Sequence, residues 1–486
     1  MALLKQFFVG FIIALLCVPV AAAQSMEKEQ ESSASEIRSY SALNKAIYWQ
    51  RMGDQTRHDE KRRENYENAS GELEVAIQSD PESSFLFTRM AEVSFSLQNP
   101  RRAMSACRKA LKLNPDNADA HFWLGRVELV RRREQEAISA FEKATEINPE
   151  HLTAQRYLSS LLFSRNDFEG AARSYSAVVR LIPYDPRLRN RLGVSYSQIG
   201  ETAKAIEEFN AAVRLNSDYL DPHFHLSYLY ARQSRNEEAI RECLIVLQRA
   251  PGDERTTLLL GELYIAMDEF DKAIAVLERF PRRRKIDEKM RAEALYRLAT
   301  AYKGKGQNDL ADSSFQKSID SYNEILKEDP SASVIRYHLA MVYDAKGDTS
   351  RAEQYLREYI SLKPGDPLAY NYLGYMLAEN DAKLEEAVEL IREAVAKEPD
   401  NGAFRDSLGW AYFKLGDLDD AISELEKAAE LIPDDSDVRE HLGEAYFKKG
   451  GGFTAKAVVQ WEKALEIKPN NKMLQQRLEE LSKSLE

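Results

Sequence analysis

The chain has 486 residues, of which 44% are hydrophobic and 30% are charged, and it holds 21 Gly and 16 Pro. This length exceeds what one compact core supports, and the composition excludes collagen-like and low-complexity chains. The formal net charge is -12, and residues 365–486 alone carry 15 Lys and Arg against 26 Asp and Glu. This acidic C-terminal third argues against nucleic acid or anionic membrane as its partner, and favours solubility or a basic partner.

The first 23 residues have the order of a secretory signal. Lys5 precedes an apolar run over 7–18, and Ala21-Ala22-Ala23 ends directly before Gln24. The run is too short to span a membrane stably, so residues 1–23 are predicted to be a cleaved signal peptide, with an uncleaved N-terminal anchor as the alternative. We therefore expect an exported protein, periplasmic or secreted, with membrane association as an open alternative.

Neither lipidation nor a second membrane segment is expected. Cys17 follows Leu16, where a lipid-attachment site would require Gly, Ala or Ser. No later stretch approaches 18 consecutive apolar residues, so no transmembrane span is expected after signal cleavage. Residues 24–40 are polar and rich in Ser and Glu, and are predicted to be a disordered linker.

From residue 84 on, the sequence repeats with a period near 34 residues. One alanine recurs in every unit, and its first five intervals are all 34: Ala103, Ala137, Ala171, Ala205, Ala239, Ala273, Ala311, Ala352, Ala387, Ala421 and Ala457. A small residue such as Gly125 or Gly193 precedes it by about twelve positions, with Leu directly before and often Tyr three after. Each unit is therefore predicted to be two helices that approach closely at the small residues.

This pattern, L-G-x-x-Y followed by Ala, a bulky apolar residue and Pro, resembles the tetratricopeptide repeat (TPR) family over eleven repeats in residues 84–469. The resemblance implies an all-α, right-handed superhelical α-solenoid of about 12 helix-turn-helix units, counting a degenerate first repeat whose second helix is 68–80. Residues 470–486 are predicted to form a C-terminal capping helix.

The period breaks at two places, and both lie between Ala273 and Ala352. The basic stretch that begins at Pro281 predicts a hinge or insertion at 281–290, which would separate a first repeat block over 41–280 from a second over 291–469. The second helix that starts before Phe315 is predicted to be longer than its counterparts by seven residues, close to two turns, which keeps its apolar face in register.

No catalytic or metal-binding constellation is expected, and no cofactor. His225, His338 and His441 share one repeat position, which the repeat explains better than a metal site does. Cys107 and Cys243 lie 136 residues apart at equivalent repeat positions and are expected to be small buried apolar residues rather than a disulfide. The chain is therefore predicted not to be an enzyme.

In the TPR family the first helices line a concave groove, and the resemblance places thirteen residues on it. They are Phe122, Arg126, Arg156, Asn190, Phe224, Tyr228, Tyr296, Tyr337, Met341, Asn371, Tyr375, Trp410 and Phe413. Many are aromatic, as protein-binding hot spots are. The alternative for each residue is that it packs against neighbouring helices.

These features predict a non-enzymatic scaffold or adaptor of the cell envelope that binds partner proteins or peptides in its groove. The stretch from Tyr370 to Ala378, with Asp406-Ser407-Leu408-Gly409-Trp410 after it, is similar to repeats of proteobacterial envelope adaptors, some of which deliver substrates to carboxyl-terminal processing proteases. The alternatives are a scaffold subunit of an envelope machine, for polysaccharide export or pilus assembly, and a regulatory subunit of an envelope enzyme.

Overall fold

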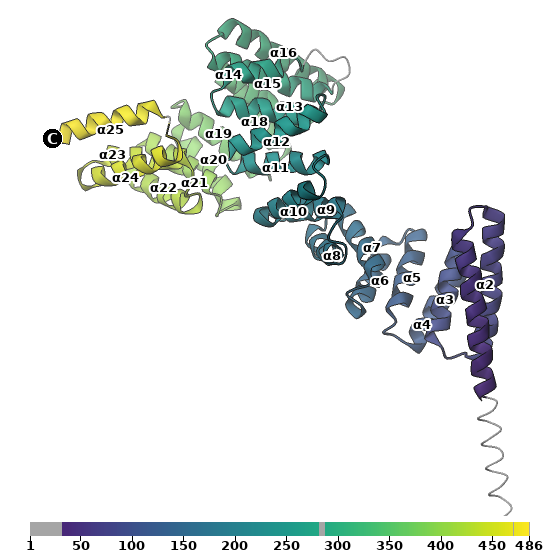
Figure 1. Cartoon of the computed structure of the whole chain (residues 1–486). Coiled ribbons are helices and arrows are strands. Elements are labelled where there is room, and N and C mark those ends of the chain that lie inside the picture. The colour runs from purple at the N-terminus through teal and green to yellow at the C-terminus, as the bar shows by residue number, and fades with distance from the viewer. Residues whose placement is uncertain (1–31, 281–286, 470, 486) are drawn as a thin grey trace, which may run out of the picture. The chain divides into compact units, whose positions relative to one another are not determined.

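The computed structural model describes residues 32–280, 287–469 and 471–485, and in these every regular element is a helix (Figure 1). The chain divides into two compact units, Met1–Gln233 and Ser234–Glu486. We call them unit 1 and unit 2. The predicted signal peptide lies outside the described residues.

Unit 1 is a succession of helix pairs. Its described part starts with a helix over 32–55, followed by α2 (Asp59–Ser79), α3 (Ser84–Ser96), α4 (Pro100–Leu113), α5 (Ala118–Val130), α6 (Glu134–Ile147), α7 (Leu152–Ser164), α8 (Phe168–Leu181), α9 (Pro186–Gln198), α10 (Thr202–Leu215) and α11 (Leu220–Arg232).

Unit 2 continues the same alternation of first and second helices. Its elements are α12 (Asn236–Arg249), α13 (Glu254–Ala266), α14 (Phe270–Leu277), α15 (Glu288–Gly304), α16 (Asn308–Glu328), α17 (Ser333–Lys346), α18 (Thr349–Leu362), α19 (Pro367–Glu379), α20 (Leu384–Lys397), α21 (Gly402–Leu415), α22 (Leu418–Leu431), α23 (Ser436–Lys449), the 3-10 turn η1 (Gly451–Phe453), α24 (Thr454–Ile467) and α25 (Lys472–Leu485).

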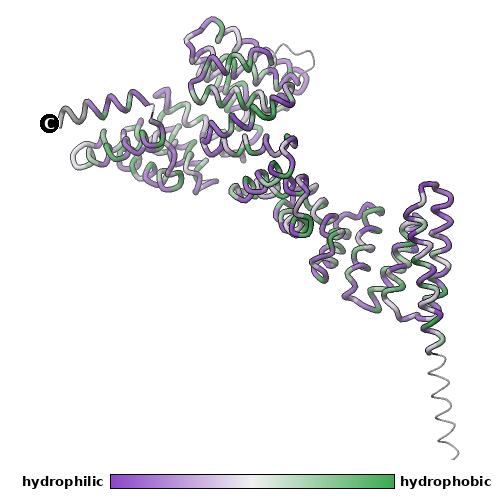
Figure 2. The backbone as a smooth tube through the Cα atoms, in the orientation of Figure 1, coloured by the Kyte–Doolittle hydropathy of each residue, from purple (hydrophilic) through white to green (hydrophobic). Residues whose placement is uncertain are grey.

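The predicted repeat register is confirmed by burial. All eleven marker alanines are buried, none with more than 3% of its surface exposed. The small residue of the first helix lies directly against the bulky residue of the second: a Cβ added to Gly125 would come within 2.7 Å of Phe141, and one added to Gly193 within 2.7 Å of Phe209. Glycine at this position therefore allows the two helices of these repeats to approach closely. Along the helices, green apolar segments alternate with purple polar ones (Figure 2).

Several helices start where an Asn or Asp side chain accepts a backbone N–H. Asn99, Asp185 and Asp366 cap α4, α9 and α19, and each is followed by a proline in the first helical turn, whose fixed φ suits that position. The cap and the proline together fix the point at which each of these three helices begins.

In several repeats an arginine near the start of the first helix donates hydrogen bonds to the turn that precedes this helix. Arg405 Nε donates to the carbonyl of Pro399 at 2.7 Å, and Arg405 Nη1 pairs with Glu424 of the second helix at 2.6 Å. Arg189 makes the equivalent contacts to Pro183 and Glu208. These bonds hold the turn between repeats against the helix pair that follows it.

The predicted seven-residue extension is confirmed. Helix α16 has 21 residues, whereas α18 has 14. Phe315, Ile319 and Tyr322 of α16 are buried, which shows that the extended helix keeps one apolar face over its whole length.

The structure divides the chain at a different place from the two repeat blocks predicted from the sequence. The division into compact units falls between Gln233 and Ser234, whereas the predicted blocks were separated by residues 281–290. Helices α13 and α14 pack on α15, so Leu277 and Phe280 share one core with Ala292 and Ala299. Of the predicted hinge, residues 281–286 lie outside the described residues and stay a prediction, whereas 288–290 form the start of α15.

The predicted disorder of 24–40 is wrong for its described part, because residues 32–40 are helical. Ser35 Oγ donates to the carbonyl of Ser79 at 2.6 Å, and Ala42 and Ala46 are buried against α2. Ser39 Oγ likewise donates to the carbonyl of Ala76, so two serines of this polar segment bind carbonyls at the end of α2.

Across the described residues no helix is both long enough and apolar enough to cross a bilayer. Cys107 lies in unit 1 and Cys243 in unit 2, and both side chains are buried as expected. Burial raises the pKa of the Cys107 thiol to about 12, which keeps it unreactive.

Candidate functional site

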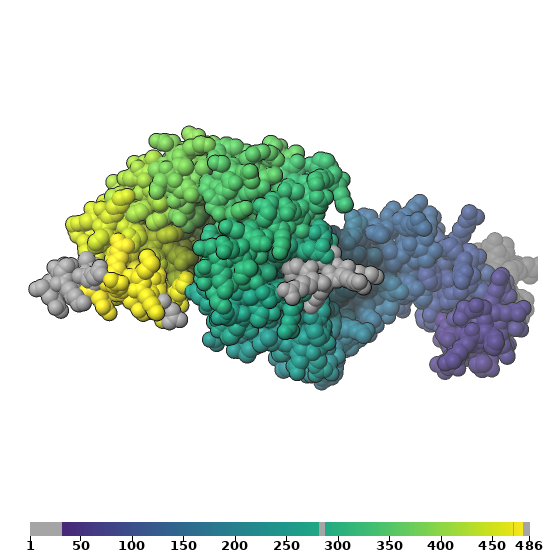
Figure 3. Space-filling model, turned by 90° about the horizontal axis from the view of Figure 1, so that it is seen from above, coloured from purple at the N-terminus to yellow at the C-terminus, as the bar shows by residue number. Residues whose placement is uncertain are grey.

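A cavity of about 400 Å³ opens on the first helices of unit 2. Its walls come from α17, α19, α21, α23 and the turn before α23: Tyr337, Leu368, Asn371, Tyr372, Tyr375, Ala403, Asp406, Ser407, Ile432, Asp435, Asp437, Val438 and His441. We call it the first-helix cavity. The surface of unit 2 is hollowed between its yellow C-terminal part and its teal helices (Figure 3).

Helix caps fix the starts of α19 and α23, two of the helices that supply most of the wall. Asp366 Oδ1 accepts the backbone N–H of Leu368, and its Oδ2 accepts the hydroxyl of Tyr359 at 2.6 Å. Asp435 Oδ1 accepts the backbone N–H groups of Asp437 and Val438 at the start of α23. Most of the wall therefore consists of side chains on helices, and only Ile432 and Asp435 come from the turn before α23.

One wall of the cavity is aromatic. The rings of Tyr337 and Tyr372 lie 5.8 Å apart between centroids, and the Tyr372 hydroxyl donates to Asp344 Oδ2 at 2.8 Å. Tyr375 is partly buried, and burial together with the charges of nearby carboxylates raises its pKa to about 12. All three phenols are therefore neutral at physiological pH and present ring surface to the cavity.

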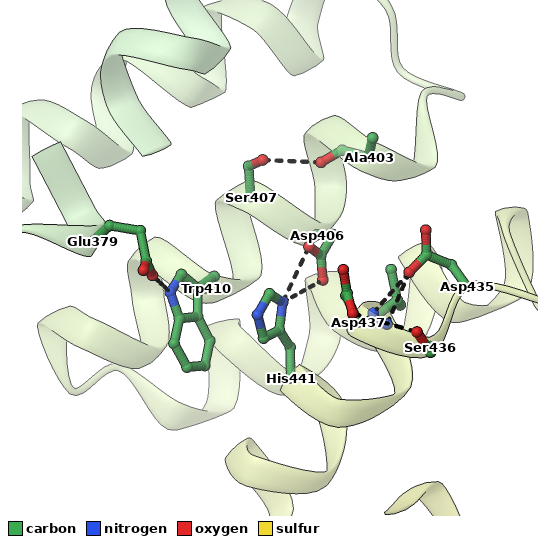
Figure 4. Close-up of polar contacts among 10 residues, drawn as sticks. Glu379, Ala403, Asp406, Ser407, Trp410, Asp435, Ser436, Asp437 and His441 are labelled. Atoms are coloured by element: carbon green, nitrogen blue, oxygen red, sulfur yellow. Dashed lines mark hydrogen bonds and ion pairs between the residues drawn. The ribbon is translucent and has the colours of Figure 1, made fainter. Parts of the chain in front are cut away.

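Carboxylates form another part of the cavity lining. Asp406 holds His441, whose Nδ1 lies 3.0 and 3.1 Å from the two carboxylate oxygens (Figure 4). Asp437 and Asp435 line the same side. Burial alone would lower the pKa of His441, but the hydrogen bond to Asp406 and the negative charges of Asp406, Asp437 and Glu379 outweigh it and raise that pKa above its usual value.

A stacked aromatic group supports this wall. Trp410 lies against His441, with centroids 4.2 Å apart and planes 19° from parallel, and against Phe413 at 4.7 Å. Its indole Nε1 donates to Glu379 (Figure 4). Trp410 therefore holds the His441 ring in place and is itself held at its polar edge.

Asn371 Oδ1 is buried at the cavity wall and has no hydrogen-bond partner among the described residues. An unsatisfied buried acceptor costs about 1–3 kcal/mol.

The Asp406–His441 pair does not form a nucleophilic triad. The nearby hydroxyl of Ser407 donates to the carbonyl of Ala403 at 3.0 Å, within its own helix (Figure 4). No group of three or more His, Cys, Asp or Glu residues suited to a metal ion occurs in the part of the chain that the structure describes. The geometry suits binding of donor groups rather than attack on a bond.

The predicted groove residues of unit 2 fall into three places. Tyr337, Asn371 and Tyr375 line the first-helix cavity, and Trp410 and Phe413 form the stack behind His441. The remaining two, Tyr296 on α15 and Met341 on α17, are partly buried outside it.

Two predicted groove residues of unit 1 belong to its interior. Phe122 and Asn190 are each only 6% exposed. Phe122 packs between Phe141 and other rings of the core, and Asn190 Nδ2 donates to the hydroxyl of Tyr219 at 3.1 Å. Their side chains are therefore not accessible to a partner in this structure, and the packing alternative holds for them.

The other predicted residues of unit 1 are more accessible. Arg126 lies 4.6 Å above the Phe95 ring and 4.8 Å above the Tyr157 ring. Arg156 is exposed and lines a separate hollow of about 480 Å³ on α7. On α11, Phe224 is partly buried and Tyr228 is 50% exposed.

The acidic residues of the cavity were missed by sequence reasoning. Asp406 and His441 lie 35 residues apart, about one repeat, so adjacent first helices bring them together. A spacing of one repeat is the sequence signal for such a contact between adjacent first helices. His441 also shares its repeat position with His225 and His338, and that recurrence points to a structural role instead.

A stack of helix pairs whose apolar faces are buried only against their neighbours defines a helical-repeat protein, or α-solenoid. Family models match along most of the described stack: the cytochrome c-type biogenesis protein H TPR domain at 104–218, and tetratricopeptide repeat models at 86–117, 190–254, 290–364, 339–402 and 409–450. The chain belongs to the tetratricopeptide repeat family.

Among known proteins the chain is similar to the TPR repeat-containing protein PA4667 of Pseudomonas aeruginosa, with 29% identity over 206 residues. The match covers 40% of this chain and 31% of that protein, so it spans only about a third of the relative's length. It is also 29% identical over 119 residues to the photosystem I assembly protein Ycf3 of Rippkaea orientalis, covering 21% of this chain and 69% of Ycf3.

Among solved structures, one of Naa15/Naa10 bound to HypK-THB has a TM-score of 0.45 at 14% identity, over 88% of this chain and 68% of that chain. Yeast Tom70 has a TM-score of 0.40 at 14% identity, over 83% and 96%. At these values neither similarity bears on function.

Proposed function

We propose that this chain is a non-enzymatic adaptor or scaffold of the cell envelope, and that it binds a protein or peptide partner in the first-helix cavity of unit 2. The observation that carries the proposal is the cavity itself. Consecutive first helices contribute rigidly held aromatic and acidic side chains to it, and the buried side-chain oxygen of Asn371 has no donor within the described part of the chain. Its volume, about 400 Å³, falls in the range of ligand pockets, roughly 300–1,000 Å³.

The envelope location rests on the residue order of 1–23 and gains support from the match of 104–218 to a cytochrome c-type biogenesis TPR domain. That match, together with the similarity to a photosystem assembly protein, favours a second candidate function. In it the chain is a structural subunit of an envelope assembly or export machine. A regulatory subunit of an envelope enzyme is the third.

Capture from envelope extract with the full-length tagged chain tests the proposal. The variant Tyr375→Ala with Asn371→Ala should lose its partner, and Trp410→Ala should weaken capture by releasing His441. Tyr184→Ala is the matched control, because Tyr184 is 81% exposed in unit 1 and lines no part of the cavity. Equal capture by all variants would reject the cavity as the binding site.

The identity of the captured proteins separates the candidate functions. A protease recovered together with client proteins supports an adaptor, whereas a fixed set of assembly components supports a machine subunit. Helical content and melting temperature should be measured for each variant, so that loss of capture is not confused with loss of folding. Turnover of a substrate by the purified chain would overturn the non-enzymatic assignment.

A further inference from the structure

The first-helix cavity combines three kinds of surface that together select one ligand chemistry. Its lining includes the aromatic residues Tyr337, Tyr372 and Tyr375 and the carboxylates of Asp437 and of Asp406, the latter held by His441. The lining also includes Asn371, whose buried Oδ1 has no hydrogen-bond partner among the described residues. Ring faces, carboxylates and an amide oxygen all attract a cation that carries N–H donors.

The carboxylates are not already neutralised by lysine or arginine. The cavity lining contains neither residue type. Asp406 is paired with His441, and Asp437 accepts only the hydroxyl of Ser436 among described side chains. The charge of Asp437 contributes to the raised pKa of both Tyr375 and His441, which is consistent with a negative potential in the cavity.

We propose that the first-helix cavity binds the guanidinium group of an arginine in an extended, basic segment of the partner, which rests on the function proposed above. A guanidinium is planar and stacks on tyrosine rings, while its fork of donors reaches a carboxylate and a carbonyl oxygen at once. Asp437 and Asn371 are the acceptors that fix it, and Tyr375 and Tyr372 are the rings that flank it. The surrounding acidic segment, net -11 over 365–486, raises the rate of encounter with such a partner.

The test uses the full chain and a fluorescein-labelled peptide with one central arginine in a Gly/Ser sequence, measured by fluorescence polarisation. Matched peptides carry lysine, citrulline or glutamate at that position. We expect the arginine peptide to bind best, lysine more weakly, and citrulline at least tenfold more weakly, because citrulline keeps the shape and loses the charge. Equal binding of arginine and citrulline peptides, or preference for glutamate, would overturn the proposal.

Variants locate the site. Asp437→Asn and Asn371→Leu should each weaken the arginine peptide by about tenfold, the effect of one lost hydrogen bond to a charged group. Asp420→Asn removes the same charge from an exposed position of α22 and should leave binding unchanged at physiological salt. Equal losses in Asp437→Asn and Asp420→Asn would mean that general charge attraction, rather than the cavity, binds the peptide.

The two proposals fail in different ways. If partner capture from envelope extract still depends on Tyr375 but arginine and citrulline peptides bind equally, the cationic ligand is wrong and the cavity remains the binding site. If neither capture nor peptide binding responds to the cavity variants, both proposals are wrong.

Discussion

The carboxylate of Asp406 on α21 holds the imidazole of His441 on α23, with Nδ1 at 3.0 Å from one oxygen and 3.1 Å from the other. The pair joins the first helices of two adjacent repeats and lies on the acidic wall of the first-helix cavity. It therefore couples the protonation of one residue to the packing of two repeats.

This pair predicts a pH dependence of the stability of unit 2. The pKa of His441 is higher in the folded than in the unfolded state. The contribution of its protonation to the free energy of unfolding should therefore be fully present below the unfolded pKa, near 6.5, and should be lost as the pH rises through the higher folded pKa. The charges of Asp406, Asp437 and Glu379 all favour the protonated ring, so no facing carboxylate reverses the sign. Melting of wild type and His441→Asn should differ most at pH 6 and least at pH 9. A difference that grows with pH would contradict this account.

The repeat register predicts a strong contrast between two alanines of α20. Ala387 is a marker alanine with 0% exposure, whereas Ala396 is exposed on the same helix. Ala387→Leu should destabilise unit 2 by about 1–3 kcal/mol because the extra methyl groups overfill the helix crossing. Ala396→Leu should change stability by no more than about 0.5 kcal/mol. Denaturant unfolding measures both, and similar values for the two variants would show that the register is wrong.

Two glycines of unit 1 should respond to alanine in opposite directions. Gly125→Ala should be destabilising, because the new Cβ would lie 2.7 Å from the Phe141 ring. Gly71 lies inside α2 with no atom within 4 Å of an added Cβ, so Gly71→Ala should stabilise by about 0.5–1 kcal/mol through helix propensity. Adding Phe141→Leu to Gly125→Ala should recover part of the loss that the two changes cause separately, and strict additivity would argue against a direct clash.

The residue order of 1–23 predicts where the mature chain begins. Cleavage after Ala23 should give a chain that begins at Gln24, which N-terminal sequencing or intact-mass measurement of protein from the native host can detect. Retention of Met1 in the membrane fraction would instead support the uncleaved anchor. Replacement of Ala23 by a bulky charged residue should block processing and serves as the control.

The fold could be predicted from the sequence to the level of single helices, because the same spacing of small and apolar residues recurs in each repeat. The marker alanines and the glycine before Phe141 are determined by local spacing, and the additional two turns of α16 follow from a count of residues. The individual side-chain contacts were not predictable from the spacing of apolar and small residues. Arg405 reaches both Pro399 and Glu424, and that spacing does not distinguish this arginine from one in solvent.

The candidate site was predicted only in part. Tyr337, Asn371 and Tyr375 were expected on the groove and do line the cavity. Phe122 was expected beside them by the same repeat position but is buried, because Trp123, Phe141 and Tyr157 surround it in unit 1. The acidic wall was missed because equivalent positions in other repeats hold unrelated residues. A binding site in a repeat array is specified by the residues that depart from the repeat.

The length of α16 has a consequence for how such a chain tolerates change. Seven residues advance a helix by nearly two whole turns, with a rotation error of about 20°, so Phe315, Ile319 and Tyr322 stay in phase with the core. An insertion of five residues would turn the distal end of that face toward solvent. Repeats of this kind can therefore gain or lose length in steps of seven without loss of stacking, and a segment added in this way becomes new surface on an unchanged scaffold.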